Sequence, residues 1–180
     1  FSKCPLKSIN IPSSVRYIRY QAFRECKKLE SLVFEVGSNL EVIEHGAFVY
    51  CSSLKSVTIP SSVEKIDEHA FRESPKLESV IFEDNGNLEI IGKCAFLGCP
   101  LKSIIIPSSV RIIDDDAFHD CSKLESVVFE ENSSLTNINK GVFCGCNRLK
   151  SIIIPASVER LSQYAFRDCK NLESVAFEED

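Results

Sequence analysis

The feature that most constrains the fold of this chain is an internal repeat of 23 to 25 residues. Segments of the form LKSxxIP alternate with segments of the form LESxxFE along the chain, and each begins with a leucine. The eight opening leucines are Leu6, Leu29, Leu54, Leu77, Leu101, Leu124, Leu149 and Leu172. Because a unit this short cannot bury its apolar face alone, the units must stack on one another. We therefore expect one repeat domain over residues 1–180.

Apolar residues keep the same places in every unit. Counting the opening leucine as position one, positions four and six are apolar, and position six alternates Ile with Phe. This spacing predicts a short strand in each unit, paired in parallel with the strand of the next unit. A tight turn and a short helical or irregular return through an Ala-Phe-x-x-Cys segment should follow. The chain begins within such a segment and stops after a strand, so we expect a window of a longer array.

The strands and the period resemble those of leucine-rich repeat proteins. The additional IPSSVxxI and AFxxC segments resemble the BspA-like, or Treponema pallidum-type, subclass. This resemblance implies an α/β repeat fold, a right-handed solenoid with a parallel concave sheet of about eight short strands. It also implies a protein-binding or adhesion module, secreted or at a cell surface, whose partner is a host or extracellular-matrix protein or a second copy in a homodimer. It brings no catalytic residues and no cofactor.

Composition narrows the function further. The net charge is −5 with interspersed signs, which argues against nucleic acid as a partner. No apolar run approaches the roughly 20 residues that span a bilayer, so no membrane insertion is predicted in this segment. The sequence contains no phosphate-binding loop and no nucleophile elbow, so we do not expect an enzyme. The alternative to a binding module is a structural or engineered scaffold without a dedicated ligand.

Positions three, five and seven of each strand should point away from the core. Position three is serine in all eight units, and position seven alternates Pro with Glu. Position five carries Ile81, Ile105, Val128 and Ile153 in four consecutive units. With strands about 4.8 Å apart, these four residues, here called the ridge, would form an apolar stripe roughly 15 Å long. Exposed apolar stripes with polar rims often mark protein-binding sites.

The candidate binding face extends beyond the ridge to its neighbours. Its predicted residues are Val33, Thr58, Ile81, Ile105, Val128, Ile153, Glu83 and Glu130. The face also suits self-association. A second interpretation needs no ligand, because β-branched residues favour strands and gain cross-strand contacts.

Lys and Glu alternate at position two, where each Lys should lie beside Glu on both neighbouring strands. The residues are Lys7, Glu30, Lys55, Glu78, Lys102, Glu125, Lys150 and Glu173. We interpret them as structural ion pairs worth about 0.2–1 kcal/mol each. A charge-reading binding site is the alternative.

Seven of the nine cysteines share the last position of the Phe-x-x-Cys segment, and Ser74 takes the eighth place. Since free cysteine is small and readily buried, we expect a column of reduced thiols. Disulfides between neighbours in the column are the alternative, although parallel side chains give poor geometry for them. Cys94 and Cys144 lie outside the column, two repeats apart, which is too far for a bridge.

The remaining polar residues give weaker signals. His45, His69 and His119 should lie on the surface without forming a cluster. The acidic run 114–116 is interpreted as a solvated turn, with weak calcium binding as the alternative. Asn132 begins an Asn-Ser-Ser sequon and is a candidate glycosylation site if a eukaryote secretes the protein. Alternatively its amide, like that of Asn85, turns inward to satisfy backbone groups of the turn.

Overall fold

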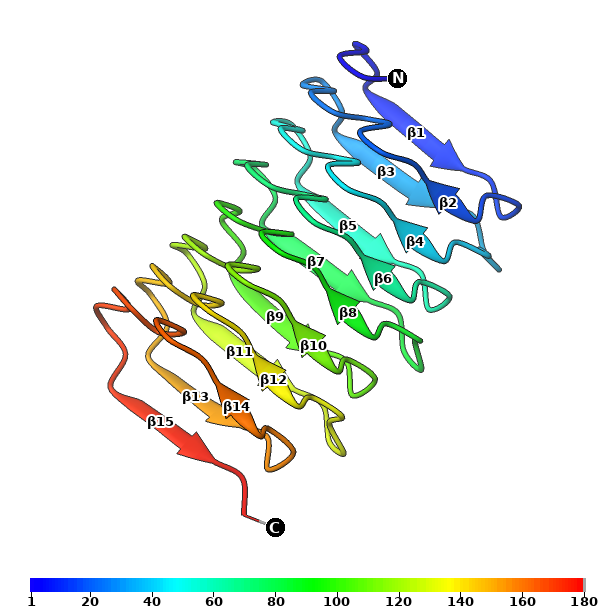
Figure 1. Ribbon diagram of the computed structural model, residues 1–180. Coiled ribbons are helices and arrows are strands. Elements are labelled where there is room, and N and C mark those ends of the chain that lie inside the picture. The colour runs from blue at the N-terminus through cyan, green and yellow to red at the C-terminus, as the bar shows by residue number, and fades with distance from the viewer. Residues whose placement is uncertain (180) are drawn as a thin grey trace.

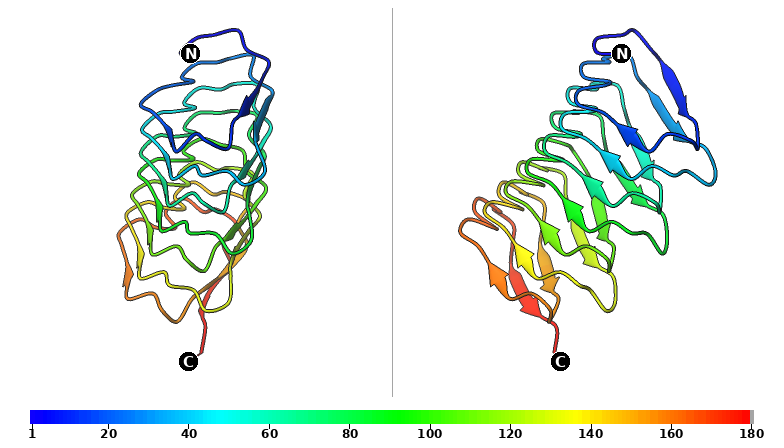
Figure 2. Two further views of the ribbon diagram at one scale, coloured as in Figure 1. Left: turned by 90° about the vertical axis from the view of Figure 1, so that its right-hand side faces the viewer. Right: turned by 45° about the vertical axis from the view of Figure 1, so that its right-hand side comes forward.

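The protein is a coil of parallel strands in two layers, shown in Figure 1 as a computed structural model that describes residues 1–179. The first layer contains the eight strands that the repeat predicts. They are β1 (Ser8–Ile11), β3 (Ser31–Phe34), β5 (Ser56–Ile59), β7 (Ser79–Phe82), β9 (Ser103–Ile106), β11 (Ser126–Phe129), β13 (Ser151–Ile154) and β15 (Ser174–Phe177). The turns of the coil stack along one axis, with the two ends of the chain at opposite ends of the stack (Figure 2).

The second layer is a parallel sheet of seven two-residue strands, which the repeat pattern did not predict. They are β2 (Tyr17–Ile18), β4 (Val42–Ile43), β6 (Lys65–Ile66), β8 (Ile90–Ile91), β10 (Ile112–Ile113), β12 (Asn137–Ile138) and β14 (Arg160–Leu161). From β2 to β12, the second residue of each strand is buried in the core. The layer is therefore a second wall, built from the Ile that follows the turn in each unit.

The α/β label is wrong, because the described residues form no helix. In the first return segment, the N–H groups of Gln21, Phe23 and Glu25 donate to carbonyls of the next repeat. Gln21 and Glu25 also have positive φ values of 52° and 55°, and later units repeat this pattern. A helix needs successive N–H groups bonded four residues back and right-handed dihedrals throughout. The return is therefore irregular, and no helix in the described part of the chain is long and apolar enough to span a membrane.

The four-residue strands bond in pairs rather than as one continuous sheet. Hydrogen-bonded ladders join β1 to β3, β5 to β7, β9 to β11 and β13 to β15. Within a pair, the Glu at position seven donates its N–H to the preceding strand, as Glu83 does to the Ile59 carbonyl at 3.0 Å. The next strand along carries Pro at this position, and proline has no N–H to donate. Pro60, Pro107 and Pro155 therefore fall at the steps where the ladder is interrupted.

The core is a stack of like residues. Eight phenylalanines form one column, in which neighbouring rings are nearly parallel with centroids 5.1–5.7 Å apart. Phe48, Phe71, Phe96, Phe118 and Phe143 in its middle are fully buried. Repetition at one sequence position thus becomes side-chain contact between successive turns, as a solenoid requires.

Candidate protein-binding surface

The ridge lies on the outer face of the four-residue strands. Ile81, Ile105, Val128 and Ile153 expose 49–59% of their surface, whereas Ile104 and Ile106 on either side of Ile105 are buried. This alternation explains the run of three isoleucines, because only the outer two of them can face the core. Parallel register places Val128 directly beside Ile105.

The face around the ridge is small and polar on one side. Position-three serines are exposed on every strand except β7, where Ser79 is half-buried. Val33 and Thr58, the other two predicted apolar or hydroxyl members of the face, are exposed as well. The eight outer strands thus present an open surface in which the apolar side chains are concentrated in the middle and C-terminal units.

Two predicted members of the face have a structural task. The Glu83 carboxylate accepts a hydrogen bond from the Ser61 N–H at 2.9 Å, and Glu130 accepts one from the Ser108 N–H at 2.9 Å. Glu35 does the same for Ser13 at 3.0 Å. These carboxylates accept from backbone N–H groups at the start of the turn that follows the neighbouring strand, which is the strand with Pro at position seven. They stabilise the edge of the face, and these carboxylates are already hydrogen-bonded before any partner binds.

The predicted alternating ion pairs at position two are mostly not formed. Among these residues in the described chain, only Lys102 and Glu78 approach within 4 Å, at 2.7 Å. Glu78 also receives Lys123 at 3.3 Å, and Glu125 pairs with Arg148 at 3.0 Å. Hydrogen bonds from Lys102 and Lys123 lower the pKa of Glu78. The prediction of a regular alternating ladder is therefore wrong. Glu78 and Glu125 reach Lys123 and Arg148, which lie in the loops before β11 and β13 and not at position two.

The cysteine column is confirmed as free thiols. All nine cysteines, which lie within residues 1–179, are unbridged. Each column thiol from Cys26 onward donates to a Phe carbonyl of the previous turn, as Cys99 does to Phe71 at 3.1 Å. The Ser74 hydroxyl makes the same bond to Phe48 at 3.4 Å. The position therefore requires a small hydrogen-bond donor, and burial raises the pKa of Cys99 to about 12.

The prediction that the histidines form no cluster is wrong for two of them. His45 stacks on Tyr20 with ring centroids 5.3 Å apart, and its centroid lies 5.3 Å from that of His69. Glu68 lies between them, 3.6 Å from His45 Nδ1 and 3.2 Å from His69 Nε2. Burial lowers the pKa of His69. Tyr20 and His45 each lie two residues before the Ala of their Ala-Phe pair, so the repeat does place them on successive turns. His69 lies one residue before Ala70, so counting positions within the repeat did not reveal its contact with His45.

The acidic run does not converge on one point, as a calcium site would require. Asp114 accepts from Asn139 Nδ2 at 2.9 Å, Asp115 accepts from the Lys140 N–H at 3.1 Å, and Asp116 lies 3.0 Å from His119 Nδ1. Within residues 1–179, no group of three or more His, Cys, Asp or Glu side chains is placed to hold a metal.

The turn asparagines point outward, so the predicted inward amide is wrong. Asn85 and Asn132 are exposed, with positive φ values of 54° and 57°. Gly37 takes the same place in an earlier unit, with φ 71°. Asparagine tolerates this left-handed backbone better than most residues, which accounts for its presence in the turn. Glycosylation of Asn132 stays a prediction.

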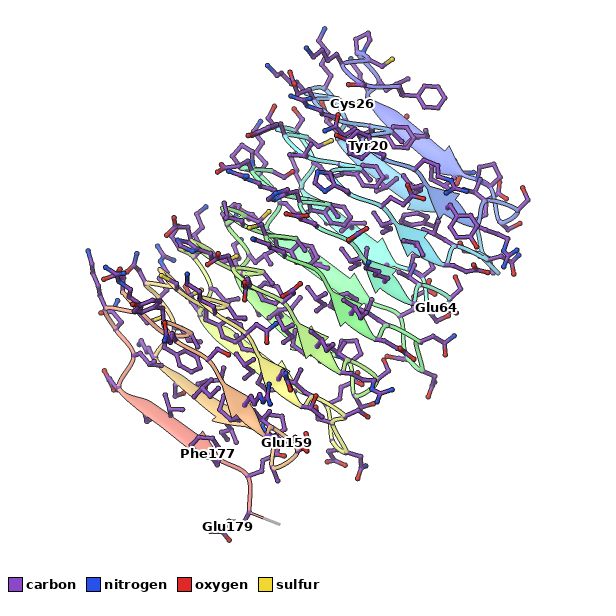
Figure 3. All side chains as sticks on the ribbon, in the orientation of Figure 1. Tyr20, Cys26, Glu64, Glu159, Phe177 and Glu179 are labelled. Carbon is purple, nitrogen blue, oxygen red and sulfur yellow. The ribbon has the colours of Figure 1, made fainter. Side chains whose placement is uncertain are left out.

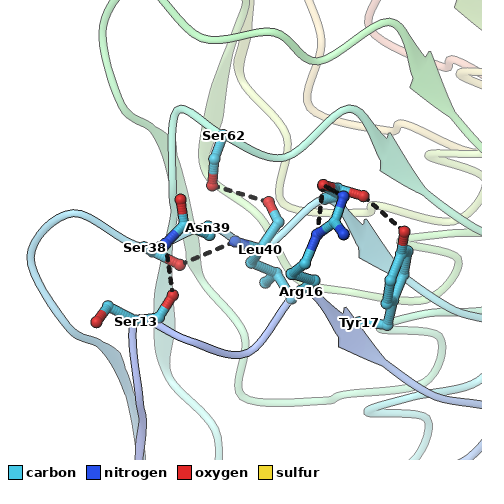
Figure 4. Close-up of polar contacts among 8 residues, drawn as sticks. Ser13, Arg16, Tyr17, Ser38, Asn39, Leu40 and Ser62 are labelled. Atoms are coloured by element: carbon cyan, nitrogen blue, oxygen red, sulfur yellow. Dashed lines mark hydrogen bonds and ion pairs between the residues drawn. The ribbon is translucent and has the colours of Figure 1, made fainter.

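Polar contacts between successive units also stabilise the turns that join the two layers of strands. Figure 4 shows the Asn39 side chain donating to the Ser13 carbonyl at 3.0 Å and the Ser62 hydroxyl donating to the Leu40 carbonyl at 2.8 Å. Beside them, Arg16 and the Tyr17 hydroxyl share the Glu41 carboxylate, which lowers the pKa of Glu41. Sequence reasoning missed this cluster because its hydrogen bonds join residues of successive units.

Comparison with known proteins adds evidence on the whole chain. A family model described as "BspA type Leucine rich repeat region (6 copies)" matches residues 1–88 and 89–180. The solved structure of the pneumococcal vaccine antigen PcpA is similar with a TM-score of 0.60 and 21% identity, over 95% of this chain and 62% of that one. No curated protein sequence matches.

Two more solved structures are similar at higher identity. A leucine-rich repeat protein from Bacteroides ovatus has a TM-score of 0.58 and 28% identity, over 96% of this chain and 55% of that one. The T. pallidum leucine-rich repeat protein has a TM-score of 0.55 and 28% identity, over 94% of this chain and 63% of that one. The chain thus spans less than two thirds of the length of each of these three proteins.

Proposed function

Because the chain belongs to the BspA-type leucine-rich repeat family, we propose that it is a non-enzymatic protein-binding or adhesion module that acts at a cell surface or after secretion. Binding would occur through the face of the four-residue strands, which we expect to be the concave side of a right-handed solenoid. The partner would be a host or extracellular-matrix protein. The similarity to a pneumococcal vaccine antigen supports the fold on which this proposal depends.

The observation that carries the proposal is the exposure of the ridge. Four consecutive units place a large β-branched side chain on the outer face, each at least 49% exposed. An exposed apolar stripe is unfavourable in water, and a partner that covers it gains about 25 cal/mol for each Å² of apolar surface buried. In the corresponding row on the opposite sheet, the aliphatic residues Val42, Ile90 and Ile112 are less exposed than the ridge. The outer strands are therefore the better apolar binding surface.

The test compares binding by three proteins to a panel of purified fibronectin, laminin and collagen, followed by biolayer interferometry. The proteins are the wild type, a ridge variant (Ile81→Thr, Ile105→Thr, Ile153→Thr) and a matched control on the opposite sheet (Val42→Thr, Ile90→Thr, Ile112→Thr). We expect the ridge variant to bind about 10-fold to 100-fold more weakly than the wild type and the control to bind normally. Binding that survives in the ridge variant but is lost in the control would refute the assignment of the face.

A further inference from the structure

The outer face carries opposite charges along its two edges. All eight strands run the same way, so their starts lie along one edge and their ends along the other (Figure 1). The start edge consists of residues 5–7, 27–30, 52–55, 75–78, 100–102, 122–125, 147–150 and 170–173. The end edge consists of residues 12–14, 35–39, 60–62, 83–87, 107–109, 130–134, 155–157 and 178–179.

The charge difference between the edges is large for so small a surface. The start edge carries ten Lys or Arg and four Glu, whereas the end edge carries seven Asp or Glu and no Lys or Arg. Most of these side chains are exposed, including Lys76 on the start edge and Asp84, Glu131 and Glu179 on the end edge. Figure 3 places Glu179 just beyond the end of β15. Across the face, the order is therefore basic edge, serines, apolar ridge and acidic edge.

A partner that covers this face must present the reverse order, and a second copy of the chain does so. Two copies can meet face to face by a twofold axis along the ridge or along the strands. An axis along the strands superposes like edges, which repel one another. An axis along the ridge reverses the strand direction, so that each basic edge lies over the acidic edge of the other copy. Each ridge residue then lies opposite its own counterpart, as in an isologous interface.

The face is also large enough for such a contact. Eight strands spaced about 4.8 Å apart, with about seven residues across the face at 3.3 Å each, give roughly 800 Å². Stable interfaces bury about 800 Å² on each partner. From the charge order, the ridge and this area, we infer that the face binds a second copy of the chain, as a dimer whose twofold axis runs along the ridge. This inference rests on the proposed function, because both use the ridge as the binding surface.

The contact is testable by reversing charges at the two edges of a unit, because the twofold axis places each unit opposite the same unit of the other copy. Lys76 and Asp84 belong to one unit, Lys170 and Glu179 belong to the last unit, and all four residues are exposed. One variant makes the end edge basic (Asp84→Lys, Glu179→Lys), and the other makes the start edge acidic (Lys76→Glu, Lys170→Glu). Glu83 and Glu130 are left unchanged because they bind backbone N–H groups.

Sedimentation velocity over a concentration series would measure the dimer Kd of each protein, with thermal melting as a check on folding. We expect the wild type to dimerise, the ridge variant to raise Kd about 100-fold, and each charge variant to raise it about 10-fold, because like edges then face one another. An equimolar mixture of the two charge variants should recover a Kd within about threefold of the wild type, since opposite charges meet again at both edges.

Three results would overturn the inference: a monomeric wild type, a dimer insensitive to the ridge variant, or no recovery on mixing. These results are separable from failure of the proposed function. A monomer that binds a matrix protein through the ridge retains the proposed function and loses the dimer. A ridge-dependent dimer whose matrix binding is the same with and without the ridge changes retains the dimer and loses the assignment of matrix binding to the ridge.

Discussion

Two columns of like residues stack along the axis of this molecule, and they differ in what the fold needs from them. The Phe-x-x-Cys column is buried, its rings stack and its thiols hydrogen-bond to the previous turn. The ridge is built from the same kind of repetition, yet its four residues are each about half-exposed. Repetition alone therefore does not indicate function. A repeated position becomes a candidate site when the fold leaves it without a structural task.

The largest expected contrast between the columns is in stability. Phe96→Ala should lower the free energy of unfolding by about 3–5 kcal/mol, because the ring is fully buried between Phe71 and Phe118. Ile105→Ala should cost less than about 1 kcal/mol, because more than half of its side chain is already in water. Urea unfolding of both variants would measure the difference. Equal losses would mean that the ridge is part of the structural core.

The thiols of the buried column should make stability depend on alkaline pH. Burial raises the pKa of Cys51 and Cys99 to about 12 from 9.0, so the unfolded chain releases these protons first. Their contribution is complete below pH 9 and declines as the pH rises toward 12. The loss should be about 1.4 kcal/mol per thiol at pH 10. Unfolding measured from pH 8 to 10.5 should show this slope.

The control is a Cys51→Ser, Cys99→Ser variant, since serine does not titrate in this range and already occupies position 74. Its pH slope should be shallower than that of the wild type. An identical slope would assign the alkaline loss to other groups.

The smallest expected effect concerns a single hydrogen bond. The Phe71 carbonyl accepts from the Cys99 thiol, whereas the Phe96 carbonyl accepts from both the Cys121 thiol and the Cys99 N–H. Cys99→Ala should therefore cost about 1 kcal/mol more than Cys121→Ala, because it leaves a buried carbonyl unsatisfied. Chemical denaturation of the two variants would test this, and a larger loss from Cys121→Ala would contradict it.

Local spacing was enough to predict the positions of the outer strands, the buried columns and the exposed ridge. Period-two alternation within a unit and identity between units both specify which side chains share a face, as for Ile105 between Ile104 and Ile106. The choice between a helical and an irregular return was left open, and the second sheet was missed. Their hydrogen bonds run between units, as from Phe23 to Ala47, so no pattern within one unit reveals them.

Long side chains escaped prediction for a similar reason. Adjacency on the sheet suggested that Lys and Glu at position two would alternate as ion pairs, but Glu125 instead reaches Arg148. Strand register fixes the backbone position of each residue. A flexible charged side chain can still pair with any of several partners, and these pairings differ little in free energy.

The placement of proline has a consequence for how such an array can change length. Strands are joined in pairs, and each pair with its loops occupies 47 or 48 residues. Loss or gain of one unit would set two Pro strands or two Glu strands side by side, and would misplace the carboxylates that bind the neighbouring turns. Loss or gain of a pair preserves every contact at the junction. We therefore expect such an array to gain or lose repeats two at a time.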